Sequence, residues 1–457
     1  MGNDTHRETL PVSVQLAYGV ADFGPSMAGN VLNVFFFFFL TSVANLPAHL
    51  AGIILLASNG WSALCTPIAG ILCDRTQSRW GRRRVWMLGS APVLALMFAL
   101  HWWVPPMGEW GRFAYYLVVA LLFQTATNGF LIPYGALVTD LTEDDRDRVR
   151  LNGWRYGFSL TGCIGALLLA QGMADWIGDP QRQLWVLGLV CAIAIVVSIG
   201  VCCARAAERF QPTPAEQVLN WSEAKKMLAN RPLVMLVGIY ALCWLGLQIT
   251  PAILPYFVAS YMELPAKAIA TVVLVMQGTA LVAMPIWEPL SRRLGKRVAL
   301  WMGVSLWISA QLGWFYLHPG QVFAFYLLAA IAGFGMAVAY LVPPSMLPEV
   351  IDWDELHTGQ RRGGLFYSFL VFLQKGTLGL GLFFVGQVLA RSGFQETATW
   401  QPDSALFAIR LLMVYLPVLA LLGSLVLTYF YPITRAVRQD TVSQLQQRRL
   451  ATSISVN

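Results

Sequence analysis

Twelve long apolar stretches, most of them separated by short polar turns, dominate this sequence of 457 residues. A helix needs about 20 apolar residues to cross the hydrocarbon core of a bilayer, and every stretch reaches that length. They cover residues 13–41, 46–73, 85–105, 113–138, 153–177, 181–204, 232–261, 267–290, 298–317, 321–347, 364–390 and 405–431. Because a backbone inside hydrocarbon must satisfy its own polar groups, this pattern predicts an all-α polytopic membrane protein with twelve transmembrane helices.

The composition agrees with this class of fold. Apolar residues make up 57% of the chain and charged residues only 12%, whereas a soluble globular protein has about 25% charged residues. A disordered chain, a disulfide-rich secreted scaffold and a nucleic-acid-binding protein are therefore excluded. The seven cysteines form no C-x-x-C pair and are interpreted as buried thiols. The first apolar stretch follows Asp4 and Glu8 and is too long for a cleaved signal peptide.

The distribution of basic residues orients the chain in the membrane. Of the 31 Lys and Arg residues, 24 fall in the loops on the side of the N-terminus and four in the opposite loops. The positive-inside rule therefore predicts that both termini are cytoplasmic, in a multi-pass protein of the inner or plasma membrane. This asymmetry explains the net charge of +7, so the lipid bilayer is expected as a partner and nucleic acid is not.

The longest polar interval divides the stretches into two groups of six. We predict an N-terminal half at residues 1–204, a cytoplasmic linker at 205–231, a C-terminal half at 232–431 and a cytoplasmic tail at 432–457. The second stretch of each half contains Pro-Ile and leads into a basic turn with a glycine, which suggests an internal repeat. Duplicated halves that hold a substrate between them are a common transporter design. The alternative is that any short cytoplasmic turn becomes basic.

Three charged residues lie deep inside predicted spans: Asp22, Arg155 and Lys375. A charge in a bilayer is costly and is usually functional. Arg155 offers a fork suited to a carboxylate, sulfonate or phosphate, and Lys375 offers a compact point charge. Two cations with one compensating acid favour an anionic solute. The alternative is that Asp22 pairs with Arg155 or Lys375 and only stabilises helix packing.

Four motifs span both halves of the chain. They are Tyr18–Gly24, Asp74–Arg84, the segment from Pro133–Leu137 through Asp147 and Arg148 to Asn152–Arg155, and Glu349–Glu355 followed by Thr358, Gly359 and Arg361–Gly364. In this order and spacing they resemble the glycoside–pentoside–hexuronide:cation symporter family of the major facilitator superfamily, the group that contains melibiose permease. The resemblance implies the major facilitator fold and the transport of a sugar-like solute by alternating access.

The chain departs from the melibiose-type pattern at the acidic half of the site. The two aspartates that bind the coupling cation in that branch correspond here to Ser62 and Thr66. A further acidic residue corresponds to Leu131, and a sugar-stacking Trp corresponds to Gly135. The resemblance therefore implies that the basic half of the site is kept, as Arg155 and Lys375, while the acidic half is lost.

Four residues are candidates for cation coupling: Asp22, Asn59, Ser62 and Thr66. A sodium site normally includes carboxylate oxygens, so the family's usual sodium site is not expected here. Asp22 is the one deep carboxylate and is a candidate proton carrier, because burial raises a carboxyl pKa and nearby cations lower it. The sequence leaves the coupling ion open between H+ and Na+, and no cofactor is expected.

The candidate substrate-binding residues combine the deep charges with aromatic rings that could stack on a sugar. They are Asp22, Arg155, Lys375, Tyr134, Trp154, Tyr340 and Tyr367. The alternative for each ring is helix packing or a place in an interfacial belt.

A cytoplasmic gate is predicted from the charged turns and helix ends: Asp74, Arg82, Arg83, Arg84, Asp140 and Asp352. Pairs that form in only one state would latch the carrier. The alternative is a solvated turn that only sets orientation, since exposed ion pairs contribute little.

The leading functional hypothesis is a symporter for a small-molecule substrate, a sugar-like anionic glycoside or hexuronide, that acts as a monomer. One alternative is a lysophospholipid carrier of the same fold, in which Lys375 would meet the phosphate and Leu131 and Gly135 would leave a more apolar surface. Another is a facilitator without sodium coupling. A membrane enzyme is disfavoured because the five histidines are scattered, and two halves with these motifs fit a carrier better than a channel or receptor.

Overall fold

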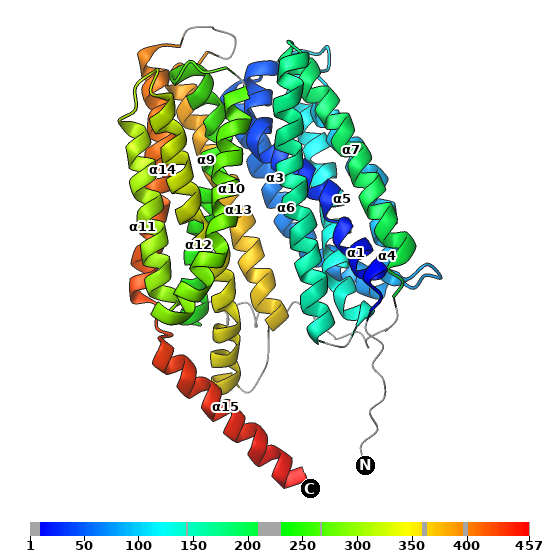
Figure 1. Ribbon diagram of the computed structural model, residues 1–457. Coiled ribbons are helices and arrows are strands. Elements are labelled where there is room, and N and C mark those ends of the chain that lie inside the picture. Colours follow the sequence, from blue (N-terminus) through cyan, green and yellow to red (C-terminus); the bar gives the residue numbers. More distant parts are fainter. Residues whose placement is uncertain are drawn as a thin grey trace. The chain divides into compact units, whose positions relative to one another are not determined.

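The computed structural model describes residues 10–142, 145–208, 230–265, 267–358, 363–395 and 401–456. Within these ranges every regular element is a helix (Figure 1). Eleven of the described helices are long and apolar enough to cross a membrane. The predicted all-α polytopic membrane class is confirmed.

The N-terminal helices are short pieces, and those that follow are long. In chain order they are α1 (Val12–Val20), α2 (Phe23–Val31), η1 (Leu32–Phe36), η2 (Phe39–Val43), α3 (Ala48–Arg75), α4 (Arg82–His101), α5 (Glu109–Leu141), α6 (Asp145–Trp176), α7 (Pro180–Arg205), α9 (Arg231–Tyr256), η3 (Phe257–Tyr261), α10 (Lys267–Leu294), α11 (Lys296–Phe315), α12 (Val322–Thr358), α13 (Gly363–Arg391), α14 (Asp403–Phe430) and α15 (Arg435–Val456). The η elements are π-helical turns, in which each backbone bond reaches one residue further than in an α-helix.

The first predicted span, residues 13–41, is not one continuous helix. α1 and α2 meet at Ala21 and Asp22, whose amides donate to the carbonyl oxygens of Tyr18 and Gly19 at 3.2 Å each. These bonds reach back three residues and tighten the turn, whereas η1 and η2 then widen it. This interruption explains why the described residues contain eleven continuous helices of spanning length where twelve spans are predicted. Broken helices are tolerated in membranes where they line a cavity or site, and Asp22 lies at the break.

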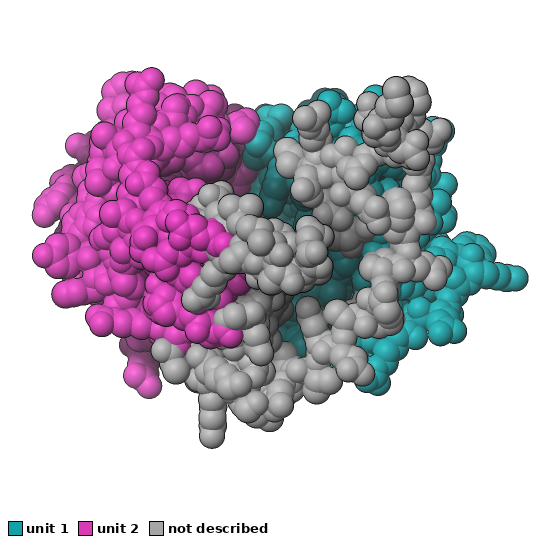
Figure 2. Space-filling view, turned by 90° about the horizontal axis from the view of Figure 1, so that it is seen from below, with its two compact units in different colours: residues 1–216 teal, residues 217–457 magenta. Residues whose placement is uncertain are grey.

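The chain divides into two compact units, residues 1–216 and 217–457 (Figure 2). The boundary falls inside the segment predicted as a linker, of which residues 209–229 lie outside the described ranges. Unit 1 contains the helices from α1 to α7, and unit 2 contains those from α9 to α15.

Both units contain the same turn between two long helices. Gly81, between α3 and α4, has φ 94° and ψ 146°, and Gly295, between α10 and α11, has φ 94° and ψ 151°. Glycine is favoured there because a Cβ would clash with the backbone. The packing repeats as well, since α5 lies against α3 and α4 in unit 1 and α12 lies against α10 and α11 in unit 2.

A second pair of turns shows the same repeat without any basic cluster. η2 ends before Asn45, with φ 51°, and η3 ends before Glu263, with φ 53°. The amide of the next leucine, Leu46 or Leu264, donates to the carbonyl oxygen six residues earlier, at 2.9 and 3.0 Å. Non-glycine residues rarely adopt this left-handed backbone. Its presence at matching positions indicates that the internal repeat extends beyond the basic turns.

One helix is not evident from the sequence. α15 lies in the predicted tail, residues 432–457, and its composition is too polar for a span. Arg438 of α15 pairs with Glu349 of α12 at 3.3 Å, and the same carboxylate pairs with Lys296 of α11 at 2.7 Å. The tail therefore begins as a helix that is fixed to unit 2 by an ion pair.

Glycines allow the broken first helix to approach its neighbours closely. A Cβ at Gly24 of α2 would lie 2.5 Å from backbone atoms of Ala194 in α7. A Cβ at Gly162 of α6 would lie 2.4 Å from the carbonyl oxygen of Phe23 in α2. In lipid, helices associate through such close packing, because burial from water supplies no driving force between them. These contacts hold α2 against α6 and α7 and so position Asp22.

Gly24→Ala is expected to destabilise the protein, whereas Gly29→Ala in the same helix is not. The added methyl group at position 24 would meet backbone that cannot turn aside, at a cost of about 1–3 kcal/mol. A Cβ at Gly29 meets nothing within 4 Å, and alanine favours a helix by up to about 1 kcal/mol over glycine. Thermal unfolding in detergent measures the difference, and equal melting temperatures for the two variants would contradict the close α2–α7 contact.

Candidate functional site

A row of polar side chains follows the contact between α6 and the broken first helix of unit 1. Its members recur at every fourth residue: Tyr18, Asp22, Ser26 and Asn30 on one side, and Arg155, Ser159 and Cys163 on the other. The hydroxyls of Ser26 and Ser159 lie 2.6 Å apart, and the Asn30 amide donates to the Cys163 carbonyl oxygen at 3.0 Å. We call these seven residues the polar row. It connects the two helices along three turns.

An ion pair between two of the charged residues singled out in the sequence lies at one end of the polar row. Arg155 Nε donates to Asp22 Oδ2 at 3.0 Å, and the exposed fractions of the two side chains are 21% and 12%. Ser26 donates to the other carboxylate oxygen at 3.4 Å. A buried charge is tolerated when it is paired and hydrogen-bonded. The structure therefore matches the alternative in which Asp22 pairs with Arg155, and the partial exposure still leaves the pair accessible.

Two tyrosines support this pair from α1 and α5. The rings of Tyr18 and Tyr134 stack with centroids 4.7 Å apart, and each hydroxyl donates to the other residue's carbonyl oxygen, at 3.3 and 2.9 Å. The guanidinium carbon of Arg155 lies 4.8 Å from the centre of the Tyr134 ring. A cation above an aromatic face is stabilised electrostatically. Arg155 is thus held between a carboxylate and a ring.

The predicted roles of Tyr134 and Trp154 as sugar-stacking rings are affected differently. Tyr134 is 0% exposed and is also stacked on Phe130 at 5.1 Å, so its faces are covered by protein, and it orients Arg155 instead. Trp154, the neighbour of Arg155 on α6, is 42% exposed. Its Cβ lies 2.8 Å from the position that a Cβ on Gly19 would take, so Gly19 makes room for it. Of the two rings, Trp154 is the one with an open surface.

The predicted coupling residues of α3 belong to a hydrogen-bond network that the sequence did not indicate. Asn128 of α5, which is 0% exposed, donates to the Ser62 hydroxyl at 3.0 Å and to the Ser62 carbonyl oxygen at 3.1 Å. The Thr66 hydroxyl lies 2.8 Å from the Ser62 carbonyl oxygen and 3.2 Å from Asn128 Oδ1. Asn59 donates to the Leu55 carbonyl oxygen at 2.8 Å. These groups join α3 to α5, and no group of three or more His, Cys, Asp and Glu suited to a metal ion occurs in the described ranges.

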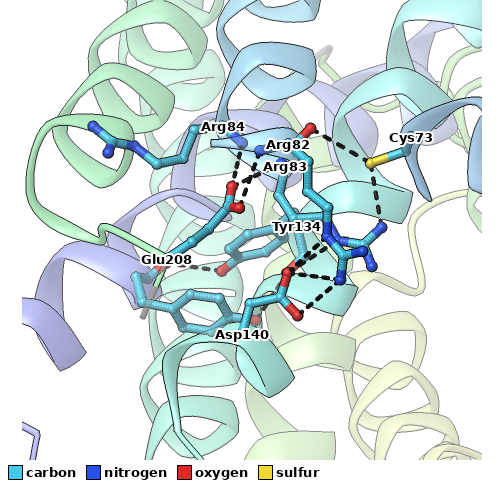
Figure 3. Close-up of polar contacts among 8 residues, drawn as sticks. Cys73, Arg82, Arg83, Arg84, Tyr134, Asp140 and Glu208 are labelled. Atoms are coloured by element: carbon cyan, nitrogen blue, oxygen red, sulfur yellow. Dashed lines mark hydrogen bonds and ion pairs between the residues drawn. The ribbon is translucent and has the colours of Figure 1, made fainter. Parts of the chain in front are cut away.

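The arginines that follow Gly81 form a cluster with the end of α5. Arg82 Nη2 and Arg83 Nε lie 3.4 and 3.3 Å from Asp140 Oδ2, and Asp140 is 0% exposed. Arg83 also donates to the sulfur of Cys73 at 3.3 Å. Figure 3 shows the Arg82 and Arg83 side chains directed at Asp140 and that of Arg84 directed away from it. The predicted gate residues Arg82, Arg83 and Asp140 are therefore brought together within unit 1.

The structure does not place two other predicted gate residues, Asp74 and Asp352, in this cluster. The side chain of Asp74 lies outside what the structure describes. Asp352 is a half-buried residue of α12 in unit 2. A further acidic residue, Glu208, takes part in the cluster through the backbone of α4 (Figure 3). No motif pointed to Glu208, because its partners are backbone amides.

The remaining candidates lie in unit 2. Lys375 is half-buried on α13, and the side chain of Tyr367 lies outside the described part of the chain. Tyr340 of α12 meets Trp244 of α9 edge-on, with centroids 6.2 Å apart, and Trp244 stacks on Tyr240 at 5.9 Å. The sequence missed Trp244 because an aromatic residue in an apolar helix carries no distinct signal. Tyr340 thus forms a group of three half-buried rings with Trp244 and Tyr240.

The chain is similar to known transport proteins over nearly its whole length. The family profile described as "MFS/sugar transport protein" matches residues 17–435. The chain belongs to this family. An uncharacterized symporter from Synechocystis sp. is 36% identical, with 98% of this chain and 99% of the relative covered. A sodium-dependent lysophosphatidylcholine symporter from Gallus gallus is 26% identical, with 97% of this chain and 90% of the relative covered.

Solved transporters share the fold at low sequence identity. The nucleoside transporter NupG superposes with a TM-score of 0.67 at 13% identity, and the match covers 93% of this chain and 100% of that one. A bacterial homologue of the human lysosomal transporter Spinster, in an inward-facing and occupied conformation, gives 0.65 at 12% identity over 94% of this chain and 97% of that one. The predicted major facilitator fold is confirmed, and so is the predicted function at the level of a membrane-embedded symporter.

The Asp22–Arg155 pair predicts a non-additive pattern of stability. Arg155→Ala leaves the Asp22 carboxylate buried without its partner, which should lower the free energy of unfolding by about 3 kcal/mol. Replacing both residues with alanine removes both charges and should recover most of that loss. Thermal unfolding of the two single variants and the double variant tests this.

Arg292→Ala is the matched control. Arg292 pairs with Glu288 at 2.6 Å, but the two side chains are 78% and 54% exposed. Loss of such a pair should change stability by less than about 0.5 kcal/mol. If the effects of Asp22→Ala and Arg155→Ala simply add, the two residues are not coupled and the pairing is contradicted.

Proposed function

We propose that the protein is a symporter for a sugar-like anionic solute, an anionic glycoside or hexuronide, and that Asp22 and Arg155 bind the solute and couple it to a proton. The observation that carries this proposal is the position of the pair, deep in unit 1, at the break between α1 and α2, and partly exposed. A charge is maintained inside a membrane protein at a cost, which indicates function.

The guanidinium of Arg155 is suited to an anionic group. Its Nε is used by Asp22, and its plane is fixed beside the Tyr134 ring. Arginine carries five N–H donors in a rigid fork, which matches a carboxylate or phosphate in a bidentate way. The Asp22 carboxylate forms an ion pair with this guanidinium, as the anionic group of a substrate would. The side chain of Trp154, the residue before Arg155, is 42% exposed, which supports binding of a sugar ring.

Charge balance then suggests the coupling ion. In the described state the charges of Asp22 and Arg155 cancel. An anion that binds Arg155 would add an uncompensated charge in a poorly solvated site, which is costly. Protonation of Asp22 removes this cost, because the substrate anion replaces the carboxylate on the guanidinium. We therefore infer one proton carried by Asp22 for each negative charge on the solute.

Sodium coupling through α3 is less favoured. The oxygens of Ser62 and Thr66 take part in the network with Asn128, and the described hydrogen bonds of this network include no carboxylate. Sodium binding normally uses several oxygens that include carboxylate. The lysophosphatidylcholine symporters among the relatives are named as sodium-dependent, and for this chain we propose a proton instead.

A lysophospholipid is the second candidate substrate, and two observations favour it. Five curated relatives at 25–26% identity are sodium-dependent lysophosphatidylcholine symporters. Gly135 of α5 is exposed, and a Cβ there would meet nothing within 4 Å. The position at which the melibiose branch places a sugar-stacking Trp is therefore open. A lipid phosphate is also an anion, and Arg155 in unit 1 and Lys375 in unit 2 each offer a cation suited to it.

We further propose that the chain is a divergent relative of the melibiose-permease branch, since it keeps Arg155 and Lys375 but not the acidic residues. The excess of basic residues in the loops on one side supports a location in the inner or plasma membrane, with both termini in the cytoplasm.

Uptake into proteoliposomes separates the candidate substrates. We expect para-nitrophenyl glucuronide to be carried. Para-nitrophenyl glucoside, which differs only in having a hydroxymethyl group in place of the carboxylate, should be carried at least about tenfold more slowly, as the loss of one charge-assisted bond implies. Arg155→Ala should abolish glucuronide uptake, while Arg292→Ala should leave it unchanged. Equal rates for the two glycosides would contradict an anionic sugar, and uptake of lysophosphatidylcholine alone would establish the second candidate.

Proton coupling through Asp22 makes a separate prediction. Uptake of the glucuronide should follow a pH gradient and should not respond to a membrane potential set with potassium and valinomycin, because one proton and one negative charge move together. Asp22→Asn should lose accumulation against a gradient but retain exchange of labelled for unlabelled glucuronide. A steep sodium requirement at fixed pH would overturn the proposed coupling ion.

A further inference from the structure

The first turn of α4 lacks a cap from its own sequence. Its N-cap residue is Gly81, which has no side chain, and the first amides of a helix have no partner within the helix. Glu208 supplies the missing acceptor. Its Oε2 accepts from the Arg82 amide at 3.0 Å, and its Oε1 accepts from the amides of Arg83 and Arg84 at 2.7 and 3.1 Å. A carboxylate is favoured at this end of a helix by the helix dipole as well.

Gly81 is required by this contact for a second reason. A Cβ at position 81 would lie 2.5 Å from Glu208 Oε1 and 2.8 Å from its Cδ, in addition to the strain of φ 94°. Gly295 in unit 2 has the same φ, but a Cβ there would meet nothing within 4 Å. Both glycines are therefore required by their positive φ, but only Gly81 is also required to leave space beside Glu208.

Glu208 lies in the segment predicted as a linker, just after the last long helix of unit 1. It follows the end of α7 by three residues, and the intervening Ala206 is 0% exposed. The boundary between the two units falls further along the chain, after Glu216. Glu208 thus binds the backbone of α4 while Asp140 binds the side chains of Arg82 and Arg83 (Figure 3). The ends of α7 and α5 are both fastened to the same turn.

Unit 2 has an equivalent arrangement of opposite charge. After α14, Arg435 donates to the Arg293 carbonyl oxygen at 3.4 Å, and Arg438 pairs with Glu349 beside Lys296. In each unit, the residues that follow the last membrane-spanning helix are therefore bound beside the turn that contains the positive-φ glycine. This recurrence with different residues indicates a requirement of the fold and not an accident of one side chain.

We propose that Glu208 is a positioning residue for transport, which fastens the start of the inter-unit connection to the Arg82–Asp140 cluster so that the two move as one body. The proposal rests on the proposed transport function and adds a residue outside the substrate site. Loss of the carboxylate would let the connection move independently of α4. Turnover would then fall while substrate binding at Arg155 stays unchanged.

The contact itself is tested by stability, without any substrate. Gly81→Ala should lower the melting temperature in detergent more than Gly295→Ala, because it adds a clash with Glu208 to the same backbone strain. In a Glu208→Ala background, the drop caused by Gly81→Ala should shrink to that of Gly295→Ala, which should itself be the same in both backgrounds. Equal drops for Gly81→Ala with and without Glu208 would overturn the contact.

Limited trypsin digestion then measures how firmly Glu208 holds the residues after α7 against α4. Arg205 is exposed, but the bond after it joins the buried Ala206, so cleavage needs local opening. Glu208→Ala should speed cleavage after Arg205 by at least about tenfold, as loss of a charge-assisted acceptor implies, and Glu208→Gln should fall between. Cleavage after Arg435 should not change. An unchanged rate after Arg205 would overturn the fastening role.

Glucuronide uptake completes the experiment. Glu208→Ala should lower the maximal rate with KM unchanged, and Glu208→Gln should restore part of it, whereas Glu288→Gln should have no effect. A change in KM alone would contradict a positioning role. If the unsubstituted protein carries no glucuronide, the proposed substrate is wrong, and the digestion and melting results still decide the role of Glu208.

Discussion

The structure depends on the cost of a charge in hydrocarbon. With no water to solvate them, charged side chains in the spans must be few and must find partners, and the pairing of Asp22 with Arg155 follows from this. The pair in turn organises its surroundings: Tyr134 covers the guanidinium, Ser26 contacts the carboxylate, and Gly24 and Gly162 allow the helices to approach so closely. The same constraint keeps the other ionic clusters at helix ends.

The two units share one backbone arrangement at the turn before α4 and α11, but different residues form the ion pairs beside it. Each contains a positive-φ glycine at the start of a helix and an acidic residue on a neighbouring helix, Asp140 of α5 or Glu349 of α12, that pairs with basic residues beside that glycine. The backbone of the repeat is shared, while the side chains differ. This division is expected when a duplicated unit keeps its packing and diverges in its chemistry.

The spans were predictable because apolar length is a strong signal, and most helix bounds lie close to the predicted ones. The break at Asp22 was not, because a tight turn followed by π-helical turns leaves the hydropathy unchanged. At the site, the scarcity of charge identified Asp22 and Arg155, and the structure adds their contact. Asn128 and Glu208 were missed since their partners are backbone groups and neutral hydroxyls, which no sequence motif records. The covering of Tyr134 depends on tertiary packing by Tyr18 and Phe130.

The position of Glu349 has a practical consequence for handling the protein. Its carboxylate is shared by Lys296 at 2.7 Å and Arg438 at 3.3 Å, so the C-terminal helix is part of the charge balance of unit 2. Trimming the chain before Arg435, as is often done to aid crystallisation, would remove one of the two cations. A purification tag is therefore better placed at the other terminus, and a protein shortened at its C-terminus should be compared with the full chain before its behaviour is interpreted.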